Sequence, residues 1–142
     1  MVFELLATFC AALFAGAAIY INLVEHPARM SLGPAVALAE WAPSYHNAAR
    51  MQAPLAMIGA LAGIAAWVRG SGAGWLIGAI LLGAVIPITL VVIMPTNREL
   101  LDPTTAGDLD RVSVLLSRWN RLHALRSVLS TIAFVMFLVL LR

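Results

Sequence analysis

Four long apolar stretches separated by polar segments dominate the sequence. They cover residues 3–24, 51–68, 74–94 and 122–141, and none carries Asp, Glu or Arg in its central part. A helix rises about 1.5 Å per residue, so about 20 such residues cross a hydrocarbon core roughly 30 Å thick. Each stretch is continuously apolar and lacks the alternation of a barrel strand. The pattern therefore predicts four transmembrane helices.

The connections between these stretches differ in length. A Gly-rich turn at residues 69–73 joins the second and third stretches, whereas each of the other two connections runs to about 26 residues. Because four spans must alternate in direction, both long connections should lie on one side of the membrane and both termini on the other. We expect a single all-α domain over residues 1–142, an integral membrane four-helix bundle with two interfacial helical connections on one side.

The long connections carry helical signals of their own. Residues 34–46 are apolar enough to lie on the membrane interface or to cap the bundle, and apolar residues recur at helical spacing from Val112 onward. We expect this second helix to begin in a capping box near Thr105 and to run into the fourth span. Pro27 should end the first helix, and Pro95 should interrupt the third.

Composition and charge support a membrane protein. The chain is 62% hydrophobic and 11% charged, against about 45–50% and about 25% in soluble proteins. Seven of the nine basic residues accompany the long connections, which places those connections on the cytoplasmic side of a bacterial inner (plasma) membrane. The net charge of +2 does not indicate nucleic-acid binding, because the arginines alternate with acids and adjoin the spans, where membrane lipid accounts for them. Abundant Gly and Ala indicate close helix packing, which is compatible with a homo-oligomer.

Polar side chains gather at the span ends on the side of the long connections. In chain order they are Glu25, His26, His46, Arg50, Asn97, Trp119, His123 and Arg126. Each of them alone would be an ordinary interfacial anchor or lipid contact. Ionisable groups near the membrane core are costly and usually paired, so their convergence predicts a functional pocket.

Two kinds of chemistry fit this set of side chains. One is metal binding, because imidazole and carboxylate groups suit iron, copper and zinc; the candidate ligands are Glu25, His26, His46 and His123. The other is general base catalysis, in which Glu25 or a histidine takes a proton while Arg50 or Arg126 stabilises the oxyanion that forms.

Two motifs resemble those of a known family. Pro-Thr-Asn-x-x-Leu closes the third stretch at residues 95–100, and Trp-x-x-x-His-x-x-Arg opens the fourth at residues 119–126. Together with four spans in a short chain, they resemble the anthrone oxygenase-like family of small membrane proteins over nearly the whole length. The resemblance implies an oxygenase that uses dioxygen to oxidise a hydrophobic phenolic or polyketide-like molecule. It carries site roles over to Asn97, Trp119, His123 and Arg126.

The leading hypothesis is therefore an anthrone oxygenase-like monooxygenase that holds iron or copper at its histidines. Its catalytic candidates are Glu25, Arg50, Asn97, Trp119 and Arg126. The alternative is a non-enzymatic membrane subunit that binds haem, quinone or lipid and supports a partner complex, with His46 and His123 as axial haem ligands. A transporter is disfavoured, because the charges stop at one membrane edge and leave no polar path through the bilayer centre.

Overall fold

The chain folds into four long helical arms. In the computed structural model, which describes every residue, the first arm consists of α1 (Val2–Tyr20), the π-helical turn η1 (Ile21–Glu25) and α2 (His26–Met30). The second arm consists of α3 (Pro34–Ala66) and the π-helical turn η2 (Trp67–Ser71). There are no strands, so the predicted all-α class is confirmed.

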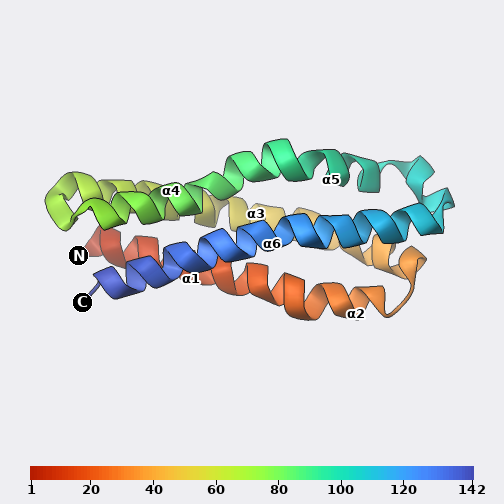
Figure 1. Cartoon of the computed structure of the whole chain (residues 1–142), viewed down its shortest axis with the longest axis horizontal. Coiled ribbons are helices and arrows are strands. Elements are labelled where there is room, and N and C mark those ends of the chain that lie inside the picture. Colours follow the sequence, from red (N-terminus) through yellow and green to blue (C-terminus); the bar gives the residue numbers. More distant parts are fainter.

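The third and fourth arms complete the fold. The third consists of α4 (Ala73–Ile88), the π-helical turn η3 (Thr89–Ile93) and α5 (Met94–Leu101). A 3₁₀ turn, η4 (Pro103–Gly107), leads to the fourth arm, α6 (Leu109–Leu140). Figure 1 shows the arms side by side, with both termini and the turn between α3 and α4 at one end and the other two turns at the opposite end. Each arm is long and apolar enough to cross a membrane.

The arms are longer than the spans predicted from sequence, because the helices continue through most of both long connections. The prediction that Pro27 ends the first helix is wrong, since the helix runs on to Met30. A proline lacks an N–H, and its ring collides with the carbonyl four residues earlier in a regular α-helix. The wider turn η1 directly before Pro27 relieves this conflict, and η3 does the same before Pro95. Residues 34–46 form the first turns of α3.

The helix of the second long connection begins later than predicted. Its N-cap is Asp108, whose Oδ1 accepts a hydrogen bond from the backbone N–H of Arg111 at 3.0 Å. Thr105 lies in η4, and its hydroxyl donates to the backbone carbonyl of Glu99. The Thr105 capping box is therefore wrong, because Asp108 satisfies the first free N–H groups instead. From there α6 runs unbroken into the fourth span, as predicted.

Two clusters of buried apolar side chains hold the arms together. The first lies toward the termini and includes Phe14, Trp75 and Phe137, of which Trp75 and Phe137 stack with ring centroids 5.1 Å apart. The second lies toward the opposite end and includes Trp41 and Trp119, which meet edge to face at 5.8 Å. The candidate site lies between these two clusters, since its lining includes Phe14 from one and Trp119 from the other.

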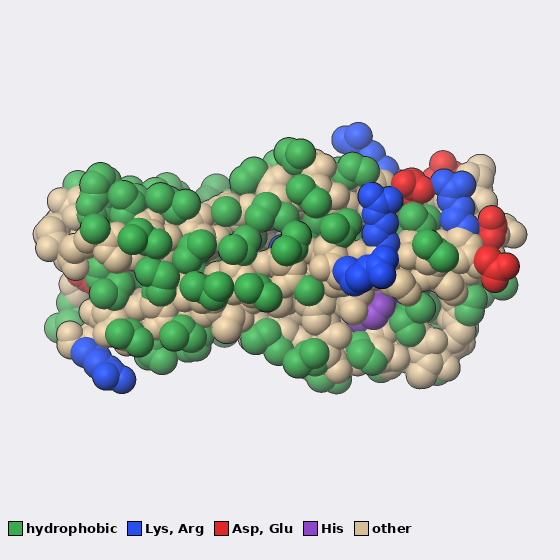
Figure 2. All heavy atoms as spheres, in the orientation of Figure 1, with side chains coloured by type: hydrophobic (Ala, Val, Ile, Leu, Met, Phe, Trp, Pro, Cys, Tyr) green, Lys and Arg blue, Asp and Glu red, His purple; other side chains and the backbone are tan.

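The surface of the arms is apolar along most of its length. Large apolar side chains are exposed on all four arms, among them Leu5, Leu61, Ile80 and Val135. Figure 2 shows the charged side chains of the visible face gathered mainly at the end away from the termini. Such a large apolar surface is unfavourable in water, and it has the arrangement expected of helices that face lipid.

Two glycines test how closely α3 and α4 pack. A Cβ at Gly63 would lie 2.9 Å from the Cβ of Ala79 and 3.2 Å from the carbonyl oxygen of Trp75, both fixed to the backbone of α4. We expect Gly63→Ala to lower the free energy of unfolding by about 1–3 kcal/mol. The control is Gly83→Ala, whose Cβ meets Ala60 at an ordinary 3.5 Å and which should be neutral or slightly stabilising. Thermal unfolding in detergent measures both variants, and equal midpoints would contradict the close packing at Gly63.

Candidate functional site

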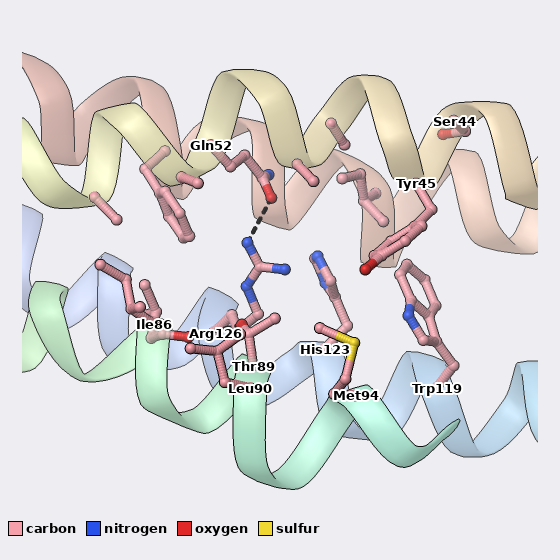
Figure 3. A pocket seen from close by; sticks show the side chains of 17 residues that line it. Ser44, Tyr45, Gln52, Ile86, Thr89, Leu90, Met94, Trp119, His123 and Arg126 are labelled. Carbon is pink, nitrogen blue, oxygen red and sulfur yellow. Dashed lines mark hydrogen bonds between the residues drawn. The ribbon is translucent and has the colours of Figure 1, made fainter. Parts of the chain in front are cut away.

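A pocket of about 210 Å³ lies among the arms at the level of η1 and η3. We refer to it as the central pocket. Its walls are largely apolar: α3 contributes the small side chains of Ala48, Ala49 and Ala53, and the facing wall contributes Leu90 and Met94 (Figure 3). An apolar cavity of roughly 150 Å³ accommodates benzene. The central pocket is therefore large enough for at least one aromatic ring.

A cation without an anionic partner projects into this pocket. Nη2 of Arg126, on α6, donates to Oε1 of Gln52 on α3 at 2.7 Å, and Figure 3 shows the guanidinium reaching across the pocket toward it. The guanidinium carbon lies 5.3 Å from the ring centre of Phe14. No carboxylate forms an ion pair with Arg126, and its Nε is enclosed without an acceptor. Arginine stays protonated in proteins, and an unpaired charge in apolar surroundings is costly. The pocket is therefore suited to bind an anion.

An imidazole lies one turn before that cation on the same helix. His123 is 1% exposed and lines the pocket beside Arg126. Its ring packs against Trp119, with centroids 4.9 Å apart, and its Nδ1 lies 3.0 Å from Oδ1 of Asn22 in η1. The ring is thus held from two sides. The pocket combines a positioned imidazole with a fixed positive charge, the pair that proton abstraction with oxyanion stabilisation requires.

The structure brings some of the predicted site residues together in this pocket. Trp119, His123 and Arg126 all line it. They are the three named positions of the Trp-x-x-x-His-x-x-Arg motif, and the spacing of that motif places them along one face of α6. The motif therefore marks one wall of the central pocket.

Glu25 does not line this wall but belongs to an ion cluster beside the pocket, of which Ser44 is a lining residue. The side chain of Arg29 is 2% exposed and pairs with both Glu25 and Glu40, while the hydroxyl of Ser44 donates to Glu25. Because Glu25 and Arg29 come from the first arm and Glu40 and Ser44 from α3, the cluster ties these two arms together. Glu25 itself does not line the central pocket, and its role as a base stays a prediction.

The remaining predicted residues also lie outside the pocket lining. Arg50 and His46 are exposed on α3. His26 is buried, with its ring centroid 6.0 Å from that of Trp119. Asn97 is fully buried in α5, and neither atom of its amide group has a hydrogen-bond partner. None of these four side chains lines the central pocket, although the ring of His26 lies near Trp119, which also packs against His123.

The four predicted metal ligands do not form a cluster. No group of three or more His, Cys, Asp or Glu side chains is placed to hold a metal ion. Glu25 is engaged by Arg29 and Ser44, His46 is exposed, and only His123 lines the central pocket. These residues do not fit the predicted iron or copper site. Metal binding stays a prediction.

Three further side chains contribute to the site, and none of them is among the predicted site residues. Gln52 is the partner of Arg126, Asn22 is the partner of His123, and Tyr45 lines the pocket beside them. The sequence does contain a pattern that could have indicated Tyr45 and Gln52. Tyr45, Ala49, Gln52 and Ala56 recur at the spacing of one helix face, and Gln52 is a long polar side chain inside an otherwise apolar span. The contact between Asn22 and His123 spans 101 positions of the chain and leaves no local pattern.

Fold and site together define a small all-α protein in which an apolar internal pocket carries a positioned histidine and an unpaired arginine. A family model described as anthrone oxygenase matches residues 41–136. The chain is also 33% identical over 105 residues to the anthrone oxygenase ptaC of Pestalotiopsis fici, an alignment that covers 63% of this chain and 73% of the relative. No solved structure matches the chain.

The chain belongs to the anthrone oxygenase family. The resemblance expected from the two motifs is thereby confirmed, and the protein is an oxygenase-like enzyme. The matched region contains the whole of the Trp-x-x-x-His-x-x-Arg motif and the pocket wall on α3 from Ser44 to Ala56.

Proposed function

We propose that this protein is a membrane-embedded oxygenase that uses dioxygen to oxidise an apolar anthrone or a related phenolic, polyketide-like molecule. The observation that carries the proposal is the unpaired guanidinium of Arg126 beside His123 in an apolar pocket. Such a molecule becomes an anion when it loses a proton from carbon. The family relationship supports the substrate class.

The membrane forms the second part of the proposal. The four arms cross the bilayer as one bundle, with the charged end at an interface and the exposed apolar side chains in lipid. The excess of arginine at that end supports a cytoplasmic position for it. An apolar substrate partitions into the bilayer and reaches the central pocket from there.

The first chemical step is proton abstraction. His123 takes a proton from the substrate carbon that lies para to the carbonyl group across the central ring, and the electron pair of the broken C–H bond delocalises onto the carbonyl oxygen. Arg126 donates hydrogen bonds to that oxygen as its negative charge develops. The guanidinium is already fixed by Gln52 and by the ring of Phe14, so little reorganisation is needed.

The second step is reaction with dioxygen. The carbanion transfers electrons to dioxygen, and a carbon–oxygen bond forms to give a peroxide anion. The protonated imidazole of His123 returns its proton to the outer peroxide oxygen. The hydroperoxide then loses water across its C–H and O–O bonds, which leaves a new carbonyl group. One dioxygen molecule is consumed and one water molecule is released for each methylene group oxidised.

Anaerobic hydrogen exchange tests the first step separately from oxidation. In D₂O without dioxygen, the purified protein should accelerate the incorporation of deuterium into the methylene group of anthrone above the buffer rate, because His123 removes and returns a proton there. Mass spectrometry measures the incorporation. Admission of dioxygen should then yield anthraquinone with uptake of one dioxygen per anthrone. Oxidation by the protein with exchange only at the buffer rate would contradict a base in the pocket.

A further inference from the structure

The side chain opposite His123 determines which ring nitrogen carries the proton. We propose that Asn22 is a positioning residue that holds His123 as the Nδ1–H tautomer and leaves Nε2 free as the base. The catalytic part of this inference rests on the proposed function, whereas the tautomer itself does not. The hydrogen bonds of the Asn22 side chain all lead to α6.

The orientation of the Asn22 amide is set by Asn120. Nδ2 of Asn22 donates to the backbone carbonyl of Asn120 at 3.0 Å and to its side-chain Oδ1 at 2.7 Å. A backbone carbonyl can only accept a hydrogen bond. The reverse orientation would place two acceptor oxygens against each other, so Oδ1 of Asn22 must face the other way, toward His123.

This orientation fixes the proton on the imidazole. Oδ1 of Asn22 can only accept, and Nδ1 of His123 lies 3.0 Å from it, so Nδ1 carries the hydrogen and donates. The hydroxyl of Ser127 donates to the same oxygen from the next turn of α6. In a neutral imidazole the other nitrogen then holds a lone pair. Nε2 makes no hydrogen bond within the protein, and the ring lines the central pocket.

The three hydrogen-bonding partners of Asn22 lie on one face of α6. Asn120, His123 and Ser127 follow one another at intervals of three and four residues, so they present one continuous face of α6 to η1. One amide group thereby connects three positions of that face. Rotation of the imidazole would break its bond to Asn22 and its packing on Trp119 together.

Nitrogen NMR tests the tautomer directly and needs no substrate. Protein labelled with ¹⁵N-histidine, with the His123 signals assigned by their loss in His123→Gln, should show Nδ1 as the protonated nitrogen and Nε2 as the unprotonated one. A His123 ring protonated at Nε2 in the unmodified protein would overturn the inference. Asn22→Leu should shift the population toward Nε2–H, and an unchanged tautomer in that variant would overturn the role of Asn22.

Steady-state kinetics tests the catalytic part. Asn22→Leu is expected to lower kcat for anthrone about 10- to 100-fold, the usual effect of removing the outer partner of a functional histidine, with little change in KM. Asn22→Asp retains an acceptor oxygen for Nδ1 and should keep the Nδ1–H tautomer, but kcat should recover only in part because its second oxygen faces the backbone carbonyl of Asn120. Asn47→Leu changes an exposed amide on α3 and should leave kcat unchanged.

The two sets of measurements separate the two proposals. If Asn22→Leu shifts His123 away from the Nδ1–H tautomer and also lowers kcat, both the positioning role of Asn22 and the proposed function are supported. Loss of the tautomer with kcat unchanged would overturn the positioning role and the assignment of His123 as the base, while Asn22 would still determine the tautomer. If Asn22→Leu does not fold, the measurement on the unmodified protein still decides the tautomer, and Asn22→Asp must retain the Nδ1–H tautomer with measurable activity.

Discussion

Replacement of His123 by Gln is expected to lower the rate of anthrone oxidation by a factor of about 10² to 10⁴, the range that a general base contributes. Gln has a similar volume, and its amide can still hydrogen-bond to Asn22, so the buried position remains filled. It cannot take a proton from carbon. The substrate should still bind, because the apolar walls of the pocket are unchanged. The rate is measured as dioxygen uptake by purified protein in detergent, after subtraction of spontaneous oxidation.

His46→Gln is the informative companion to this variant. His46 is exposed on α3 and does not line the central pocket, so its replacement should leave the rate within about twofold of the unmodified protein. The predicted metal ligand set includes both histidines, so that hypothesis expects losses in both variants. Equal and large losses, with iron or copper bound in stoichiometric amount to the unmodified protein, would contradict the metal-free mechanism.

Replacement of Arg126 by Met should separate activity from stability. Loss of the charge that faces the developing oxyanion is expected to lower kcat about 10²- to 10³-fold. Removal of an unpaired cation from an apolar pocket also removes its desolvation cost, and Met covers a similar stretch of the pocket wall. The midpoint of thermal unfolding should therefore stay the same or rise, although the hydrogen bond to Gln52 is lost. Fluorescence-monitored unfolding and dioxygen uptake measure the two effects on the same sample.

Arg121→Met is the matched control for this variant, because Arg121 lies on the same helix with its side chain exposed. It should change neither kcat nor the unfolding midpoint appreciably. A strong fall in the midpoint for Arg126→Met would indicate that the arginine serves to hold α6 and α3 together. An unchanged kcat in Arg126→Met would contradict the role of Arg126 in oxyanion stabilisation, on which the proposed function rests.

Local patterns were sufficient to predict the helices and one wall of the site. The apolar periodicity that predicts four spans depends on neighbouring residues, and so does the spacing that aligns Trp119, His123 and Arg126 on one face. Gly70 and Gly72, both at positive φ, form the turn expected at residues 69–73. These features could be predicted because each is contained within a few helical turns.

The parts of the site that could not be predicted from the sequence depend on contacts between distant residues or on irregular helical turns, neither of which a local pattern encodes. Asn22 and Glu25 should share a face in a regular α-helix, but the π-helical turn η1 contains both. The extra residue of such a turn changes the direction in which later side chains point. Asn22 consequently contacts α6, whereas Glu25 contacts Ser44 on α3. His46 and Arg50 lie on a face of α3 that points away from the central pocket. Which face of α3 meets the pocket depends on how the other helices pack against it, and the sequence of α3 alone does not show this.

The two π-helical turns beside the pocket also bear on how this family can vary over evolution. Each holds one residue more than the α-helical turn it replaces, and each supplies side chains to the pocket, Ile21 from η1 and Leu90 from η3. Deletion of a single residue there would restore a regular α-helix and rotate the remainder of the arm while leaving its membrane-crossing length almost unchanged. Single-residue gaps at these two places in family members would therefore mark enzymes whose pocket presents a different set of side chains to its substrate.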